Sequence, residues 1–250
     1  MPKLLIVDPL DLTLKSEDGD TLWSSKSCFE ACLRETENLV CEYTTARDPE
    51  LCRRASKANG VILGGSEASA WEDTVFNDQL LDLIAICKNN KIPFLGICYG
   101  AQLLGRALGA RVGKHPSGIE LGAPSIRLTK AGRSNPLLEG LGGDSFRSIE
   151  THSDAVFTVP PGSEILASTT HTPVQAFSYQ GLLTGVQFHP EMNGGDLRFL
   201  WKAFQQKGLI DHVPEEYWTL IESCQCERKD SILRTFAERV RSSLSSRVVA

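Results

Sequence analysis

Cys98 lies between two glycines, Gly96 and Gly100, in the sequence Gly-Ile-Cys-Tyr-Gly. The apolar run over 92–97 predicts a buried strand, and apolar residues at helical spacing after Cys98 predict a helix that Gly109 ends. A cysteine at such a sharp turn is the thiol form of the nucleophile elbow. The free N–H groups at the helix N-terminus would favour its thiolate. The alternative interpretation is a small buried cysteine between two packing glycines.

A histidine and a carboxylate follow a second apolar run, which starts at Gly185 and ends in His189, Pro190 and Glu191. A cysteine nucleophile needs a base to hold it as a thiolate and an acid to protonate the leaving group, and histidine, with a usual pKa of about 6.5, can do both. Glu191 would lie on the same side of an extended chain and could orient the imidazole. Taken alone, His-Pro-Glu at a strand end is also typical of a simple turn.

Two glycines follow the apolar run 61–63. Backbone N–H groups at Gly64 and Gly65 could approach a ligand closely and, with the N–H of Tyr99, form an oxyanion hole. The alternative is an ordinary glycine-rich turn between a strand and a helix.

The elements that must position these residues alternate between strands and helices in the first part of the chain. This alternation predicts an α/β fold with a mostly parallel sheet covered by helices on both faces. The carboxyl ends of such strands carry the functional sites, which suits both Cys98 and Gly64. The strands are expected over 4–7, 39–44, 61–63 and 92–97, the helices over 29–36, 49–55, 75–87 and 99–108, and a polar loop up to Ser27.

The second part of the chain has a different pattern. Short strands joined by turns are expected over 110–114, 123–128, 163–168, 174–179 and 182–188, and they indicate a smaller mixed or antiparallel sheet. Residues 214–226 and 231–244 are expected to form helices. The second of these has one apolar stripe, formed by Ile232, Phe236, Val240 and Leu244, which suits packing on the body of the protein.

Composition narrows the functional classes. The chain of 250 residues is 41% hydrophobic, which is enough to build a full core. Its net charge of −5 and the lack of a basic block argue against nucleic acid as a partner. The eight cysteines are scattered, and Cys224 and Cys226 have no ligand cluster nearby, so we expect reduced thiols and no metal site. No apolar run has the length of a membrane span, and the start is too short and too soon polar for a signal peptide, so we expect no membrane partner and a cytoplasmic location.

Together these segments resemble the class I, triad-type glutamine amidotransferases. The stretches 96–102 and 185–191 resemble the nucleophile motif and the His-x-Glu motif of that family, in the expected order. The resemblance extends to residues 64–65, 119–122 and 151–154. It covers residues 1–205 as one catalytic domain with a flavodoxin-like fold, and leaves 206–250 as a helical C-terminal extension packed on it.

The resemblance implies roles for individual residues. Cys98 would be the nucleophile, His189 the general base and acid, and Glu191 the group that orients His189. The oxyanion and substrate-binding residues would be Gly64, Gly65, Tyr99, Gln102, His152, Ser153 and Asp154. Gln102 would contact the γ-glutamyl group, and the backbone of 152–154 would hold the amino-acid head group, although the His152 ring could instead be structural. No metal or cofactor is implied.

The implied reaction is hydrolysis of the γ-glutamyl amide bond of glutamine, or of a γ-glutamyl amide or peptide, through a thioester. The chain resembles free-standing members of the family that are γ-glutamyl peptidases or γ-glutamyl amide hydrolases. The alternatives are a glutaminase subunit that passes ammonia to a separate synthetase, an inactive regulatory module, and a different enzyme, such as an acyltransferase or peptidase, on the same elbow. The intact triad argues against the inactive module.

Overall fold

Buried apolar runs form the parallel half of a nine-stranded sheet in the computed structural model, which describes residues 1–210 and 212–242. Each neighbouring pair in this half is parallel. Four of the five strands are buried along nearly their whole length, as expected for a sheet covered on both faces. In spatial order the strands are β15 (Leu183–Val186), β6 (Phe94–Ile97), β5 (Gly60–Leu63), β1 (Lys3–Asp8) and β4 (Val40–Thr45).

Antiparallel strands extend the same sheet beyond β15, so the strands predicted over 123–128, 163–168, 174–179 and 182–188 join the central sheet, and the strand predicted over 110–114 does not. They are β14 (Ala176–Tyr179), β13 (Ser163–Ser168), β9 (Ser125–Leu128) and β10 (Ser145–Arg147). Smaller antiparallel sheets are also present, as predicted. They pair β2 (Thr13–Lys15) with β3 (Thr21–Ser24), β7 (Val112–Lys114) with β12 (Asp154–Val156), and β8 (Glu120–Gly122) with β11 (Glu150–His152).

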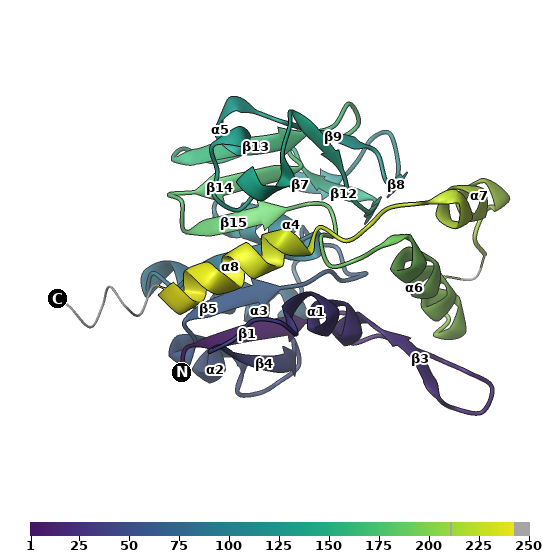
Figure 1. Ribbon diagram of the computed structural model, residues 1–250, viewed down its shortest axis with the longest axis horizontal. Coiled ribbons are helices and arrows are strands. Elements are labelled where there is room, and N and C mark those ends of the chain that lie inside the picture. The colour runs from purple at the N-terminus through teal and green to yellow at the C-terminus, as the bar shows by residue number, and fades with distance from the viewer. Residues whose placement is uncertain (211, 243–250) are drawn as a thin grey trace.

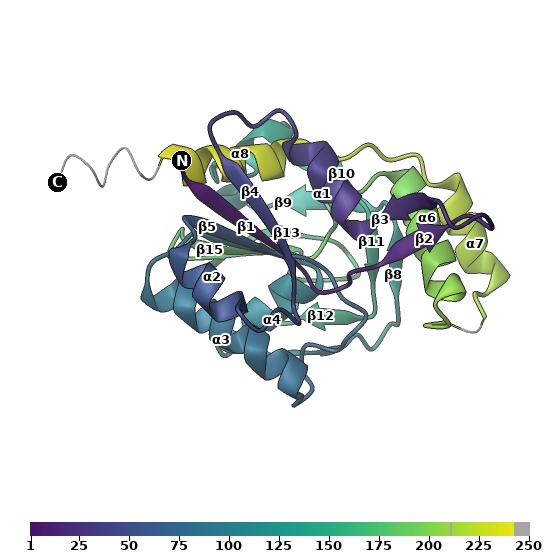
Figure 2. The same ribbon diagram turned by 90° about the horizontal axis from the view of Figure 1, so that it is seen from below.

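Helices cover both faces of the sheet, as the α/β pattern predicts (Figures 1 and 2). One face packs against α2 (Leu51–Lys57), α3 (Val75–Asn89) and α4 (Tyr99–Ala107). The other face packs against α1 (Ser25–Leu33) and α8 (Asp230–Ser242). The remaining helical segments are α5 (Lys130–Arg133), a 3-10 turn (Glu139–Leu141), α6 (Gly194–Gln206) and α7 (Glu215–Ser223). None of the helices in the described ranges is both long and apolar enough to cross a membrane.

The C-terminal helix α8 contributes directly to the core. Ile232, Phe236 and Val240 are at most 1% exposed and lie in the apolar cluster that α8 shares with α1. They form the predicted stripe, whose last member, Leu244, lies outside the described residues. The sheet approaches α8 so closely at Gly60 that a Cβ there would lie 2.2 Å from the Val240 side chain.

A third apolar cluster lies beside the sheet and joins the β2–β3 hairpin to α6 and α7 (Figure 1). The hairpin occupies part of the stretch expected to be a polar loop. Burial of Leu14 and Trp23 in this cluster stabilises the strand pairing. The helix α1 begins at Ser25, earlier than expected, because Ser24 and Ser27 form a capping box.

Candidate active site

Cys98 forms a strained turn between β6 and α4. Its backbone has φ +51° and ψ −107°, a region that non-glycine residues rarely occupy and that costs about 1–3 kcal/mol. The Cys98 amide donates to the Val186 carbonyl at 2.8 Å, which ties the turn to the neighbouring strand β15. The strand–turn–helix geometry expected of a nucleophile elbow is therefore present at this cysteine.

Close backbone contacts explain both flanking glycines. A Cβ at position 96 would lie 2.4 Å from the Gly100 carbonyl oxygen, and a Cβ at position 100 would lie 2.2 Å from the Leu63 carbonyl oxygen. Both contacts are with backbone atoms, which cannot move aside without distorting the sheet. The glycines therefore let α4 lie directly against the ends of β5 and β6.

We expect Gly100→Ala to lower the free energy of unfolding by about 3 kcal/mol, because the new methyl group would collide with the Leu63 carbonyl. Urea denaturation measures the change. Gly113→Ala is the matched control, since the space around its Cβ position is open within 4 Å. Equal stability of the two variants would show that the elbow does not need Gly100.

His189 lies beside this turn with its orientation fixed. Its Nδ1 atom lies 2.7 Å from Glu191 Oε1, so Nδ1 carries the proton and donates to the carboxylate. Its Nε2 atom has no hydrogen-bond partner among the described residues and lies on the side of Gly65. A Cβ at Gly65 would meet His189 Cε1 at 3.0 Å and Cys98 Cβ at 3.8 Å, so the imidazole and the thiol face the same small space.

The surroundings of His189 favour its charged form. Burial alone opposes a charge on this ring, which is 4% exposed. The carboxylate of Glu191 and the sulfur of Cys98 outweigh burial and hold the pKa of His189 well above its usual value. The site can therefore keep an imidazolium beside the cysteine and deliver a proton from it.

Gln187 is a further residue that contacts the sulfur, and it is not among the site residues predicted from the sequence. Its Nε2 atom lies 3.6 Å from Cys98 Sγ, and its Oε1 atom accepts from Gln102 Nε2 at 3.3 Å. Gln187 and His189 are two residues apart, and side chains at this spacing point to the same side of an extended chain. This period-two pattern, already used for His189 and Glu191, could have revealed Gln187.

The two glycines after β5 differ in what their amides do. The Gly64 amide donates to the Val7 carbonyl at 3.0 Å and is therefore already used in the sheet. Gly65 lies against His189, and Tyr99 is the first residue of α4, where an amide has no partner inside the helix. Of the amides expected to bind an oxyanion, those of Gly65 and Tyr99 are the better placed.

Gln102 and Asp154 border the space next to Cys98. Gln102 Nε2 donates to the Asp154 carbonyl at 2.8 Å, which leaves Gln102 Oε1 as the atom that could accept from a ligand. The Asp154 carboxylate accepts from Trp71 Nε1 at 2.9 Å. Cys98, Gln102, Ser153 and Asp154 line one cavity of about 210 Å³.

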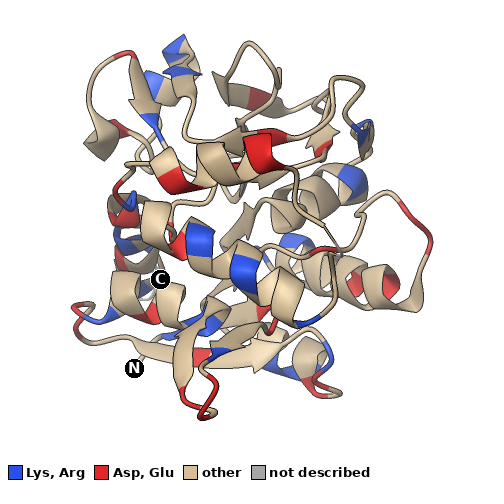
Figure 3. Cartoon of the chain, turned by 90° about the vertical axis from the view of Figure 1, so that its right-hand side faces the viewer, with Lys and Arg blue, Asp and Glu red and all other residues tan. Residues whose placement is uncertain are grey.

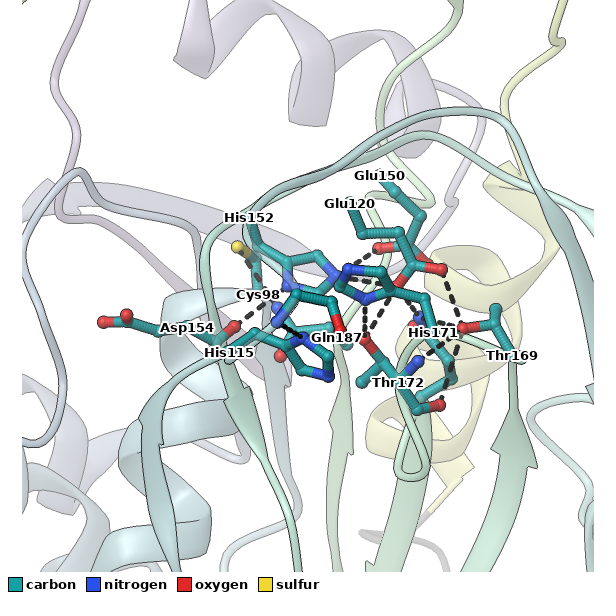
Figure 4. A network of polar contacts seen from close by, with 12 residues as sticks. Cys98, His115, Glu120, Glu150, His152, Asp154, Thr169, His171, Thr172 and Gln187 are labelled. Carbon is teal, nitrogen blue, oxygen red and sulfur yellow. Dashed lines mark hydrogen bonds and ion pairs between the residues drawn. The ribbon is translucent and has the colours of Figure 1, made fainter.

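His152 also lines that cavity, and its ring contacts a buried acidic cluster (Figure 4). Its Nδ1 atom lies 2.9 Å from the Asp154 carbonyl, and its Nε2 atom lies 3.2 Å from Glu120 and 3.1 Å from Glu150. Both ring nitrogens face only acceptors, so both carry protons. Burial opposes the charge, but the two carboxylates raise the pKa of His152 to about 10.

The same cluster has the spacing of a metal site, because the ligand atoms of Glu120, Glu150 and His152 lie within 4.8 Å of one another. A proton on His152 explains the arrangement without an ion. Glu120 accepts further hydrogen bonds from Thr169, Thr172 and Gln175. The burial of Glu150 raises its pKa to about 6, so its protonation at and below that pH reduces the net negative charge of the cluster. We interpret the cluster as a structural support for the 152–154 segment.

The comparison with protein families agrees with this geometry. The model of the class I glutamine amidotransferases matches residues 24–201. The chain belongs to this family. Glutamine-hydrolysing GMP synthases are similar to it: that of Leifsonia xyli is 36% identical over 143 residues, and that of a Nostoc species is 34% identical over 161 residues. These alignments cover 55% and 64% of this chain but only 27% and 28% of the synthases.

Solved structures of class I glutamine amidotransferases have the same fold. A glutamine amidotransferase from Thermotoga maritima superimposes with a TM-score of 0.68 at 25% identity, over 96% of this chain and 98% of that one. The family assignment and the fold expected from the resemblance are thus confirmed.

Proposed function

We propose that this chain hydrolyses the γ-glutamyl amide bond of glutamine, or of a γ-glutamyl amide, with Cys98 as nucleophile. The observation that supports this most directly is the position of His189. It donates to Glu191 through one nitrogen and turns the other towards the space shared with Cys98 at the strained turn. This arrangement of nucleophile, base and orienting carboxylate is typical of acyl transfer through a covalent intermediate.

The proposed reaction has two halves. The Cys98 thiolate attacks the γ-carbonyl carbon, and the Gly65 and Tyr99 amides stabilise the oxyanion. The C–N bond then breaks as the His189 imidazolium protonates the departing nitrogen, which leaves a γ-glutamyl thioester and free ammonia or amine. Neutral His189 next takes a proton from water, whose oxygen attacks the thioester. Glutamate is released, and the thiolate and imidazolium re-form.

The larger cavity suits the glutamyl part of the substrate. Asp154 and Glu67 line it and could attract an α-ammonium group, while Gln102 Oε1 could accept a hydrogen bond. Ser153 places the backbone of the 152–154 segment against the same space. The His152 ring would then act indirectly, by holding the Asp154 carbonyl in place.

We expect Gln187→Leu to lower kcat about tenfold, because a hydrogen bond to a charged partner contributes about 1.5 kcal/mol. Loss of this donor should also slow the alkylation of Cys98 at a fixed pH, since the thiolate loses a stabilising contact. Glutamate release and iodoacetamide labelling measure the two effects. Gln225→Leu, at an exposed position, is the control. An unchanged alkylation rate in the Gln187→Leu variant would contradict a direct role for Gln187.

A second candidate function is a glutaminase subunit that supplies ammonia to a separate synthetase. The similarity to part of the GMP synthases favours it. The two functions use the same triad and differ in dependence on a partner. A hydrolase releases glutamate at its full rate alone, whereas a glutaminase subunit needs its synthetase for full activity. A steady-state assay of the isolated chain with glutamine and with γ-glutamylethylamide therefore tests the first function, and absence of glutamate release from both substrates would contradict it.

A further inference from the structure

Two adjoining cavities share Cys98 in their walls, and they differ in character. The larger, of about 210 Å³, contains Gln102 and Asp154, as described above. The smaller, of about 40 Å³, contains His189 and Glu191. Residues common to both walls are Cys98, Ser66, Thr151 and Phe204.

The proposed reaction assigns one half of the substrate to each cavity, and the inference below rests on that function. The departing nitrogen must face His189, because that ring protonates it. Any group bonded to the nitrogen then enters the smaller cavity, which contains His189. The glutamyl part occupies the larger cavity beside Gln102 and Asp154.

Apolar atoms form most of the surface of the smaller cavity. Phe29 and Met192 are 3% exposed, Leu200 is 2% exposed, and Leu10 closes the cavity from the loop after β1. One water molecule needs about 10–15 Å³ of such space, so about 40 Å³ admits the nitrogen and a short chain of carbon atoms. Ammonia alone would leave the apolar walls without a contact.

The charges around the smaller cavity disfavour an anionic leaving group. Its ionisable lining residues besides Cys98 and His189 are two carboxylates, Asp8 and Glu191. Neither cavity has a lysine or arginine among the described residues that line it. Basic positions do occur on this side of the molecule, interspersed with acidic ones (Figure 3). The His189 imidazolium is already paired with Glu191, so an amino acid or peptide leaving group would bring its carboxylate near Asp8 with no free cation to pair with.

We propose that the smaller cavity is a subsite for a short uncharged alkyl group, and that the preferred substrates are γ-glutamyl amides of small alkylamines. The wall of Phe29, Leu200 and Phe204 would cover the alkyl chain, and Asp8 and Glu191 would exclude a carboxylate. Glutamine would be cleaved more slowly, and γ-glutamyl peptides would be poor substrates.

A substrate series tests this proposal with the full chain. Glutamate release is measured with glutamine, γ-glutamylethylamide, γ-glutamylisobutylamide and γ-glutamylglycine. The last two leaving groups have nearly the same shape and differ by the carboxylate. We expect kcat/KM for the ethylamide to exceed that for glutamine about tenfold, from the burial of two carbon groups. We expect γ-glutamylglycine to fall at least tenfold below the isobutylamide.

A charge placed at the cavity wall gives a second measurement. Leu10 is half-buried, so Leu10→Lys can bring an ammonium group to the cavity without replacing a core side chain. We expect it to raise kcat/KM for γ-glutamylglycine about tenfold relative to the isobutylamide. Leu22→Lys, at a position 56% exposed on the β2–β3 hairpin, is the matched control and should leave the ratio unchanged.

The outcomes separate this inference from the proposed function. Cleavage of glutamine that depends on Cys98, with the ethylamide no better than glutamine, would overturn the alkyl subsite and leave the function standing. Equal rates for γ-glutamylglycine and the isobutylamide would overturn the exclusion of carboxylates. If none of the four substrates releases glutamate, both the proposed function and the alkyl subsite are contradicted.

Discussion

Cys98→Ala is expected to abolish glutamate release, with a loss of about 10⁵-fold or more, because the thioester intermediate needs the Cys98 sulfur. The sulfur lies at the end of β6, in the wall of both cavities. The alanine variant should still bind substrate and keep the oxyanion amides, but it lacks the atom that forms the bond to the γ-carbonyl carbon. Turnover is measured as glutamate released per chain under saturating substrate.

The fold should tolerate this substitution, which makes the test specific. The turn conformation at position 98 costs alanine no more than cysteine, since both have a Cβ. We therefore expect the urea midpoint to change little. Cys98→Ser places a hydroxyl where the thiol was. This variant should also be severely impaired, because His189 is matched to a thiol. Full turnover by the alanine variant would remove the covalent mechanism.

His189→Gln is expected to lower kcat about 10³-fold, because positioned proton transfer contributes about 10²–10⁴-fold. Glutamine fills much of the space of the ring but cannot carry the proton to the leaving nitrogen. The loss should affect kcat more than KM, since His189 lies on the side of Cys98 away from Gln102 and Asp154. A variant with wild-type kcat would show that another group transfers the proton.

Glu191→Gln should produce a smaller loss and a characteristic change with pH. Glu191 is the carboxylate that raises the pKa of His189 against the effect of burial. The charged ring is required to protonate the leaving group, so activity falls as pH rises through the pKa of His189. Removal of the carboxylate lowers that pKa, and the alkaline limb of the pH–kcat profile should move to lower pH. An unmoved limb would contradict the pairing of Glu191 with His189.

The parallel half of the fold follows from short-range signals. Buried runs such as 61–63 end in glycines, and the helix after Cys98 has a clear apolar period, so strand ends and the elbow could be placed from the sequence. The elbow could also be recognised from the spacing of its two glycines, because the backbone approaches so closely at Gly96 and Gly100 that other residues are excluded. The β2–β3 hairpin escaped prediction because its strands depend on distant packing against α6.

The surroundings of the site were harder to predict, because they arise from pairing between distant strands. Glu120 lies opposite His152 in the pairing of β8 with β11. Glu150 precedes His152 by two residues and so points to the same side. The contact with Glu120 cannot be read from local spacing, whereas Glu150 and Gln187 could have been found, because each lies two residues from a predicted histidine. The sequence thus indicates the reactive groups more readily than the groups that support them.

The clearest test of the account is the site of modification by a glutamine-like electrophile. Burial raises the pKa of the other seven thiols, which makes them poor nucleophiles near neutral pH; they are Cys28, Cys32, Cys41, Cys52, Cys87, Cys224 and Cys226. The chain is treated with a chloroketone analogue of glutamine and mapped by peptide mass spectrometry. We expect one adduct per chain, on Cys98, formed in step with the loss of activity and prevented by excess substrate. Labelling spread over several cysteines, or full activity with Cys98 modified, would contradict Cys98 as the nucleophile.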